Sequence, residues 1–153
     1  MDETYVKIRG EWVDLYRAVD RDGNTVDFRL SRKRDVAAAK AFLRKALKVQ
    51  GQAPLSITLD GYAASHRAVR EMPDEDVIWR DTKLRPSKYL NNMIEQDHRG
   101  MKSHIVPMLG FKVLKQAAVT IAGIKLLHRI RKGQFDLGRL GIQDQVGTAV
   151  FSA

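Results

Sequence analysis

The sequence predicts an α/β domain with a mixed sheet of about five strands flanked by helices. Three observations predict this class. Apolar and polar side chains alternate through the first thirty residues, at the period of a β-strand. Two later segments, 36–47 and 111–131, carry apolar residues at helical spacing. Between them an apolar, strand-like run at 55–59 leads through a turn into a segment of helical character.

The first third of the chain predicts an antiparallel meander of three strands. Short polar turns separate these strands, which cover residues 4–8, 12–19 and 25–30. In the second strand Val13 and Leu15 lie on one face and Tyr16 on the other. The acidic turn 20–24 faintly resembles a calcium loop. It lacks the sixth-position glycine and the distal glutamate, so a hairpin turn is favoured.

Helices and two further strands are expected after the meander. Ser31 is the expected cap of a helix from Val36 to Leu47, which Gly51 and Pro54 end. The remaining expected elements are a strand at 55–59, a helix from 62, a fifth strand at 77–79, a polar loop at 81–90, and helices at 92–107 and 111–131. Residues 134–153 show weak periodicity and are expected to be a loosely held tail after a domain at 1–133.

Composition narrows the class of function. The chain of 153 residues has a formal net charge of +9, which predicts a polyanionic partner, nucleic acid before membrane. It has no cysteine, which excludes disulfides and thiolate chemistry and fits a reducing cytoplasm. The most apolar stretch, 117–127, contains Lys125 and is too short to span a bilayer.

Three acidic residues predict a metal site. Asp2 opens the first strand, Asp60 closes the apolar run at 55–59, and Glu95 lies in a predicted helix. Hard carboxylate oxygens suit Mg²⁺ or Mn²⁺, and a pair of such ions is usual equipment for phosphodiester chemistry. On the helix, Asn92, Glu95, His98, Arg99 and Lys102 share one face. Taken alone, that face is better explained as a solvated polar surface with incidental charge.

These residues resemble a known family. The segments Asp2-Glu3-Thr4-Tyr5-Val6-Lys7, Leu59-Asp60-Gly61 and Asn92-x-x-Glu95-x6-Lys102 are similar to the DDE catalytic domain of bacterial insertion-sequence transposases, of the IS-six type. The similarity covers roughly residues 1 to 133, and the spacing between Asp60 and Glu95 is that group's pattern.

The resemblance implies an RNase H-like, retroviral-integrase-like fold. It also implies that Asp2, Asp60 and Glu95 hold Mg²⁺ or Mn²⁺, that Lys102 contacts DNA phosphate, and that Asn92 supports the site. The implied activity is cleavage at the element ends followed by attack of the freed 3′-hydroxyl on target DNA. The implied partners are those DNAs and, for a full-length protein, further copies of itself. Further basic residues are expected beside the site: Lys83, Arg85, Lys88 and Arg99.

The chain departs from the family at its start. Family members carry an upstream helical DNA-binding segment, whereas this sequence begins one residue before Asp2. The resemblance therefore implies a truncated transposase with reduced recognition of element ends. Two alternatives stay open: an impaired fragment that binds DNA without sequence preference, and a stand-alone RNase H-like nuclease. A clustered set of carboxylates also predicts a raised pKa for one or more of them when no metal is bound.

Overall fold

The computed structural model describes residues 1–59, 61–86 and 110–135, and these form the predicted α/β class. The predicted meander is confirmed as three antiparallel strands: β1 (Asp2–Ile8), β2 (Glu11–Val19) and β3 (Thr25–Ser31). The register sets Asp2 opposite Arg17. The turn into β3 is a hairpin turn, as expected, because the Asp20 carboxylate accepts from the backbone N–H groups of Asp22 and Asn24.

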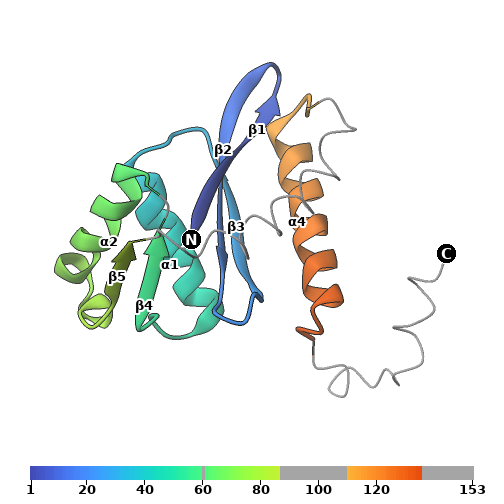
Figure 1. Ribbon diagram of the computed structural model, residues 1–153. Coiled ribbons are helices and arrows are strands. Elements are labelled where there is room, and N and C mark those ends of the chain that lie inside the picture. The colour runs from blue at the N-terminus through green and yellow to red at the C-terminus, as the bar shows by residue number, and fades with distance from the viewer. Residues whose placement is uncertain (60, 87–109, 136–153) are drawn as a thin grey trace.

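Two further strands pair with each other. β4 (Ser56–Leu59) and β5 (Lys83–Pro86) run parallel, with Ser56 opposite Lys83. Within the described residues the five strands therefore form a three-stranded and a two-stranded sheet. The start of β1 nevertheless lies beside β4, because the Met1 amino group donates a hydrogen bond of 2.8 Å to the Thr58 carbonyl oxygen (Figure 1).

The fifth strand was predicted at the wrong place. Val77–Trp79 forms a short 3-10 helix, η1, because the Asp76 side chain accepts from the Ile78 N–H and turns the chain. Trp79 then enters the core with 1% of its surface exposed. The actual strand, β5, lies inside the segment expected to be a polar loop. Its backbone pairs with β4 and its half-buried Leu84 packs against the core.

Helix α1 (Val36–Gln50) begins later than its predicted cap. Asp35 is the N-cap, and its Oδ1 accepts from the Ala38 N–H at 2.8 Å. Ser31 instead ends β3, and its hydroxyl donates to the Lys33 carbonyl. Gly51 ends α1 as predicted, in the left-handed conformation with φ of 77°.

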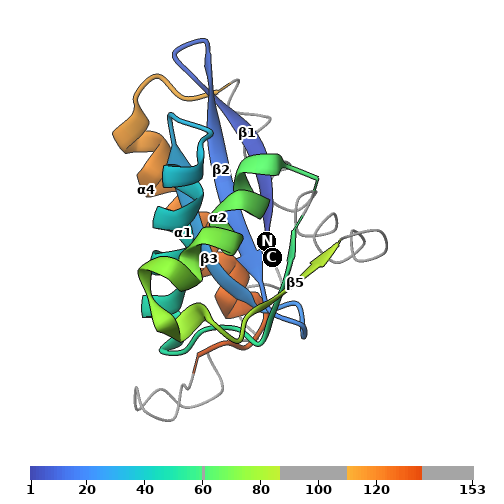
Figure 2. The ribbon, with the colours of Figure 1, turned by 90° about the vertical axis from the view of Figure 1, so that its left-hand side faces the viewer.

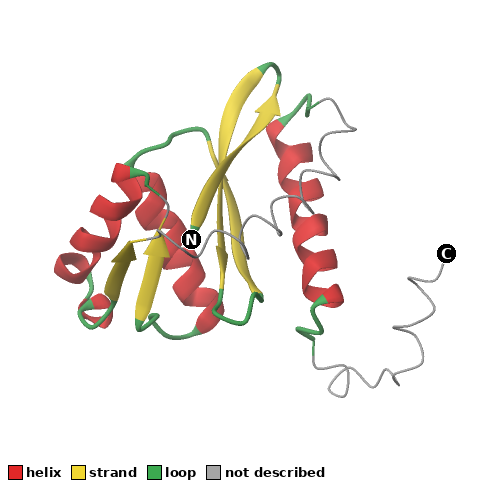
Figure 3. Cartoon of the chain, viewed as in Figure 1, coloured by secondary structure: helices red, strands yellow, loops and turns green. Residues whose placement is uncertain are grey.

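Helices cover both faces of the meander. α1 packs on β2 and β3 at one face, and α2 (Ala63–Glu75), which follows β4, packs on α1 and β5. α4 (Leu114–Arg131) covers the opposite face of the meander (Figure 3). The stripe predicted on α4 is confirmed for its buried members, Ala117, Ile121, Ile124 and His128; Val113 precedes the helix as its N-cap residue. No helix in the three described ranges is long and apolar enough to cross a membrane.

The core is divided by the three-stranded sheet into two clusters. One cluster lies between β2, β4, α1 and α2 and contains Tyr16, Phe42, Leu59, Met72 and Trp79. The other lies under α4 and contains Val6, Val13, Leu15, Phe28 and Ile121. The two faces predicted for β2 are therefore confirmed, since Leu15 and Tyr16 lie in different clusters.

The chain beyond α4 is tied to the meander at Gln134, the first residue of the segment expected to be loosely held. Its side-chain amide accepts from the Thr25 N–H at 2.9 Å and donates to the Thr25 carbonyl at 3.0 Å. Residues 136–153 and the predicted helix at 92–107 lie outside the described residues.

Candidate functional site: the start of β1 and the end of β4

Asp2 lies where the two sheets approach each other. The hydrogen bond between Met1 and Thr58 places Asp2 beside the end of β4, just before Asp60 in the sequence. The carboxylate Oδ2 of Asp2 lies 3.6 Å from Nη2 of Arg17. The side chain of Arg17 is 1% exposed and that of Asp2 is 13% exposed. Asp2 is therefore a ligand candidate that already has one cationic neighbour.

The segment around Asp60 has the geometry that the sequence predicts. β4 ends at Leu59, the described chain resumes at Gly61, and α2 begins at Ala63, so the strand–turn–helix prediction is confirmed on either side of Asp60. Asp60, Glu95, Asn92, Arg99, Lys102 and Lys88 lie outside the described residues. Within the described ranges no group of three acidic or histidine side chains is placed to hold a metal ion. The convergence of Asp2, Asp60 and Glu95 stays a prediction, as does a raised pKa among them.

Arg34 gathers two buried acids immediately beside this region. Its Nε lies 3.1 Å from Oε2 of Glu3, on β1, and 3.5 Å from Oδ1 of Asp14, on β2. The side chains of Glu3 and Asp14 are only 1% and 8% exposed. Arg34 therefore holds two buried carboxyl groups together beside Asp2.

The pKa of the Asp14 carboxyl follows from its burial in this cluster. Burial raises the pKa of its carboxyl above the ordinary value, and the positive charge of Arg34 offsets only part of the rise. Asp14 Oδ1 accepts no hydrogen bond within the described residues. Keeping the Asp14 carboxylate ionised in this cluster therefore costs free energy of folding.

The same cluster positions the chain that follows Asp60. The Tyr62 hydroxyl donates a hydrogen bond of 2.6 Å to the Arg34 carbonyl, and the Arg34 guanidinium lies 3.7 Å from the centre of the Tyr62 ring. On the first turn of α2, the Ser65 hydroxyl donates to Oε1 of Glu3. These contacts fix the start of α2 against β1, and so fix both ends of the turn that carries Asp60.

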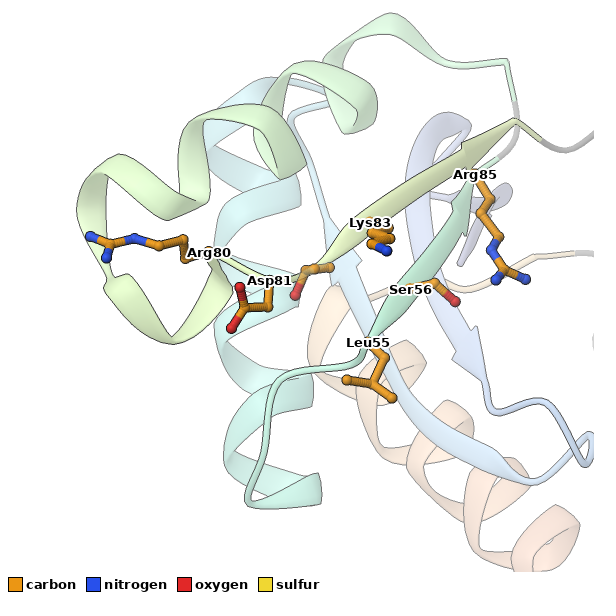
Figure 4. A pocket seen from close by; sticks show the side chains of 7 residues that line it. Leu55, Ser56, Arg80, Asp81, Lys83 and Arg85 are labelled. Carbon is orange, nitrogen blue, oxygen red and sulfur yellow. The ribbon is translucent and has the colours of Figure 1, made fainter.

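Two of the predicted basic residues are described. Lys83 and Arg85 alternate with Leu84 on β5, and both are exposed. A pocket beside them is lined by Leu55, Ser56, Arg80, Asp81, Thr82, Lys83 and Arg85 (Figure 4). Arg80 points away from the strands, whereas Arg85 lies with Ser56 beside β4. The basic side of this pocket is therefore next to the strand that leads to Asp60.

Sequence reasoning missed Arg34 and its two acids. A usable signal exists for the acids, because Glu3 and Asp14 occur inside strands that bury both faces, and a buried carboxylate requires a partner. No comparable signal exists for Arg34, which is one of three consecutive basic residues in the loop after β3.

Comparisons with known proteins identify the family of this chain. The DDE_Tnp_IS240 family, described as a DDE domain, matches residues 1–134. The chain is 36% identical over 137 residues to a Staphylococcus aureus protein named transposase for insertion sequence-like element IS431mec, covering 86% of this chain and 57% of that protein. A S. aureus transposase for insertion sequence element IS257 in transposon Tn4003 matches equally.

A shorter match is a Yersinia pseudotuberculosis protein, pYV0051, named as uncharacterized. It is 31% identical over 77 residues, covering 49% of this chain and 72% of that protein. The chain spans somewhat more than half the length of the transposases that it matches. No solved structure matches it. The family match over most of the chain and the transposase relatives together show that this protein belongs to the DDE transposases of the IS-six type, of which it carries the catalytic domain.

Proposed function

We propose that this domain cleaves DNA strands at the ends of an insertion sequence and transfers the freed 3′-hydroxyl to target DNA. The observation that carries the proposal is the hydrogen bond between Met1 and Thr58, which sets Asp2 beside the strand that leads into Asp60. Asp2, Asp60 and Glu95 are the proposed metal ligands. The transposase names of the relatives and the DDE-domain match support the reaction class.

The donor chemistry of this region fits a divalent metal. Carboxylate oxygens are the ligands that Mg²⁺ and Mn²⁺ prefer. The neighbouring buried carboxyl groups of Glu3 and Asp14, which contact Arg34, add further acidic groups to this region. Bound metal would supply activation of the attacking oxygen and stabilisation of the leaving one.

The chain's own residues have separate roles in the proposal. Lys102, Arg99, Lys83, Arg85 and Lys88 contact DNA phosphates, and Asn92 supports Glu95. The exposed positions of Lys83 and Arg85 on β5 support such contacts. Phosphate neutralisation releases counterions, so binding is expected to fall steeply with salt. A cytoplasmic location and assembly with further copies belong to the same proposal.

The finer fold belongs to this proposal too. The contact of Met1 with Thr58 favours a strand order of β3-β2-β1-β4-β5, in which β1 and β4 are central neighbours, as in an RNase H-like sheet. The division into a catalytic domain at 1–133 and a tail at 134–153 is proposed on the same basis.

One observation favours the second candidate, a fragment that binds DNA without cutting it. Arg17 already neutralises Asp2, so a metal at this carboxylate must compete with a buried guanidinium 3.6 Å away. Strand transfer and simple DNA binding are therefore to be measured separately.

The test is strand transfer on supplied DNA ends in Mg²⁺ and in Mn²⁺. The unaltered chain is expected to join the 3′-hydroxyl of the supplied end to target DNA. Asp60→Asn and Glu95→Gln are each expected to abolish joining and to leave DNA binding in place. Asp74→Asn, at an exposed acid on α2, is the matched control and should remain active. Joining by Asp60→Asn at the rate of the unaltered chain would contradict the proposed ligands. DNA binding without joining in every variant would favour the second candidate.

A further inference from the structure

Among the residues that the structure describes, no helix covers one face of the outer half of the β1–β2 hairpin. The register sets Tyr5 opposite Asp14 and Lys7 opposite Trp12, so all four side chains lie on the face that carries α1 and α2 nearer its base. The hairpin extends past the ends of both helices (Figure 2). Trp12 is 66% exposed and Tyr5 is 47% exposed, whereas Trp79, the other tryptophan, is 1% exposed.

Aromatic rings and cations follow one another along this face in one continuous line of contacts. Starting at α2, the Arg34 guanidinium lies 3.7 Å from the Tyr62 ring centre and 5.0 Å from the Tyr5 ring centre. The Tyr5 and Trp12 rings lie 6.4 Å apart with planes at 70°, and the Lys7 ammonium is 5.7 Å from the Trp12 ring. We refer to these five residues, Tyr62, Arg34, Tyr5, Trp12 and Lys7, as the aromatic ladder.

Backbone hydrogen bonds with Phe111 hold in place the hairpin that carries the ladder. The Phe111 N–H donates to the Lys7 carbonyl at 2.9 Å, and the Arg9 N–H donates to the Phe111 carbonyl at 2.7 Å. Gly110 makes this approach possible, because a Cβ there would lie 2.9 Å from the Lys7 carbonyl oxygen. A tryptophan held on a fixed strand loses little further conformational freedom when a flat ligand stacks on it.

The exposed charges near the aromatic ladder indicate which kind of ligand it can bind. Lys7, Arg9, Arg32 and Lys33 are exposed around the outer ladder, whereas the acids of the same face, Glu3 and Asp14, are buried. A polyanion with flat aromatic groups matches a surface of exposed rings among cations. Single-stranded DNA offers both features, since its base faces are free, while a duplex hides those faces in its stack.

We propose that the aromatic ladder binds unpaired bases of single-stranded DNA, by stacking on Trp12 and Tyr5 while Lys7 and Arg9 contact the phosphates. The proposal rests on the proposed function for its partner, DNA. It adds a substrate class: a DNA end whose strands are separated. Because the ladder ends at Tyr62, two residues after Asp60, a strand lying along it leads towards the proposed catalytic carboxylates.

The first test uses the difference in exposure between the two tryptophans. In the unaltered chain, acrylamide quenches Trp12 and spares the buried Trp79. A short oligothymidylate, added in EDTA at constant salt, is expected to protect Trp12 from acrylamide. A duplex of equal phosphate number is expected to give much less protection. Equal protection by both, or none by either at saturation, would overturn the proposal.

The second test uses variants. Trp12→Ala is expected to weaken oligothymidylate binding about tenfold, and Trp12→Phe to retain most of the affinity. Val77→Ala, at an equally exposed apolar residue on η1, is the matched control and should bind normally. Melting of each variant checks that the fold is kept. Unchanged affinity in a folded Trp12→Ala protein would overturn the proposal, as would an equal loss for duplex. A changed sedimentation coefficient with unchanged affinity would assign the face to a protein partner instead.

Failure here is distinguishable from failure of the proposed function. Asp60→Asn should lose strand transfer but still protect Trp12 in EDTA. Strand transfer by the unaltered chain without protection of Trp12 would remove only the ladder. Protection without strand transfer would remove only the catalytic proposal.

Discussion

Two buried acidic sites in this domain differ in how their carboxyl groups are paired with cations. At the edge strand β3, the single carboxylate of Asp27 accepts from Lys125, on α4, and lies 3.0 Å from the ammonium of Lys45, on α1. On β1 and β2, the two carboxylates of Glu3 and Asp14 share the one guanidinium of Arg34. Within the described residues, Asp27 contacts two lysine ammonium groups, whereas Glu3 and Asp14 both contact the guanidinium of Arg34.

The pKa directions follow this difference. Burial alone would raise the pKa of Asp27, but the hydrogen bonds from Lys125, Lys45 and the Phe28 N–H hold it below its ordinary value. Burial raises the pKa of Asp14, and Arg34 does not reverse the rise. The Asp27 site therefore ties two helices to the sheet. The Glu3–Asp14 site holds two buried carboxyl groups on Arg34, next to the proposed metal ligand Asp2 in the chain.

The largest expected effect comes from removing the shared cation. Arg34→Met should destabilise the domain by about 3 kcal/mol at pH 7, because it removes the guanidinium that contacts two buried carboxylates. Urea unfolding measures the change. The loss should shrink as the pH falls, since the Asp14 carboxyl, whose pKa is raised, takes up a proton and loses its buried charge. A loss that is independent of pH would show that the Tyr5 and Tyr62 ring contacts, not the acids, explain it.

A smaller loss is expected at the balanced site. Asp27→Asn should cost about 2 kcal/mol at pH 7, because Lys45 and Lys125 are partly exposed and regain water when the carboxylate is removed. With a lowered folded pKa, Asp27 contributes stability above its unfolded pKa of about 3.8, and that contribution is lost as the pH falls through the folded pKa. The variant and the unaltered chain should therefore converge in stability in strong acid. A constant difference down to pH 2 would contradict the ion-pair account.

The smallest expected effect has the opposite sign. Folding penalises the ionised form of Asp14, so Asp14→Asn should stabilise the domain by about 1 kcal/mol at pH 7. The gain should disappear below pH 3.8, where the carboxyl is protonated in both states. Thermal melting across pH 3 to 8 measures it. Destabilisation at pH 7 would mean that the Arg34 attraction exceeds the burial cost.

Local patterns were sufficient for most of the fold. Strict alternation identified β1 to β3, and helical spacing identified the buried face of α4. β5 was missed because its sequence, Lys-Leu-Arg-Pro, has no alternating apolar pattern, and the strand depends on backbone pairing with β4. The apolar Val77–Trp79 resembled a strand, but the Asp76 cap, a local side-chain contact, made it a 3-10 helix.

The candidate site was less accessible to such reasoning. Asp2 and Asp60 are predicted site residues because acids at strand ends and the family spacing mark them. Arg34 and Tyr62 were not found, because their contacts join residues 28 positions apart across a loop and a helix start. The ladder on the hairpin depends on the register of β1 against β2, which alternation alone does not fix.

The most direct test of the account is the effect of metal on thermal stability. Mn²⁺ or Mg²⁺ at 100 times its Kd is expected to stabilise the unaltered chain by about 2.7 kcal/mol, because metal binds only the folded form. Asp60→Asn should remove most of that gain. Asp27→Asn, which alters an acid already balanced by two lysines, should keep it. A gain of equal size in the unaltered chain and in Asp60→Asn would contradict a metal site at the end of β4.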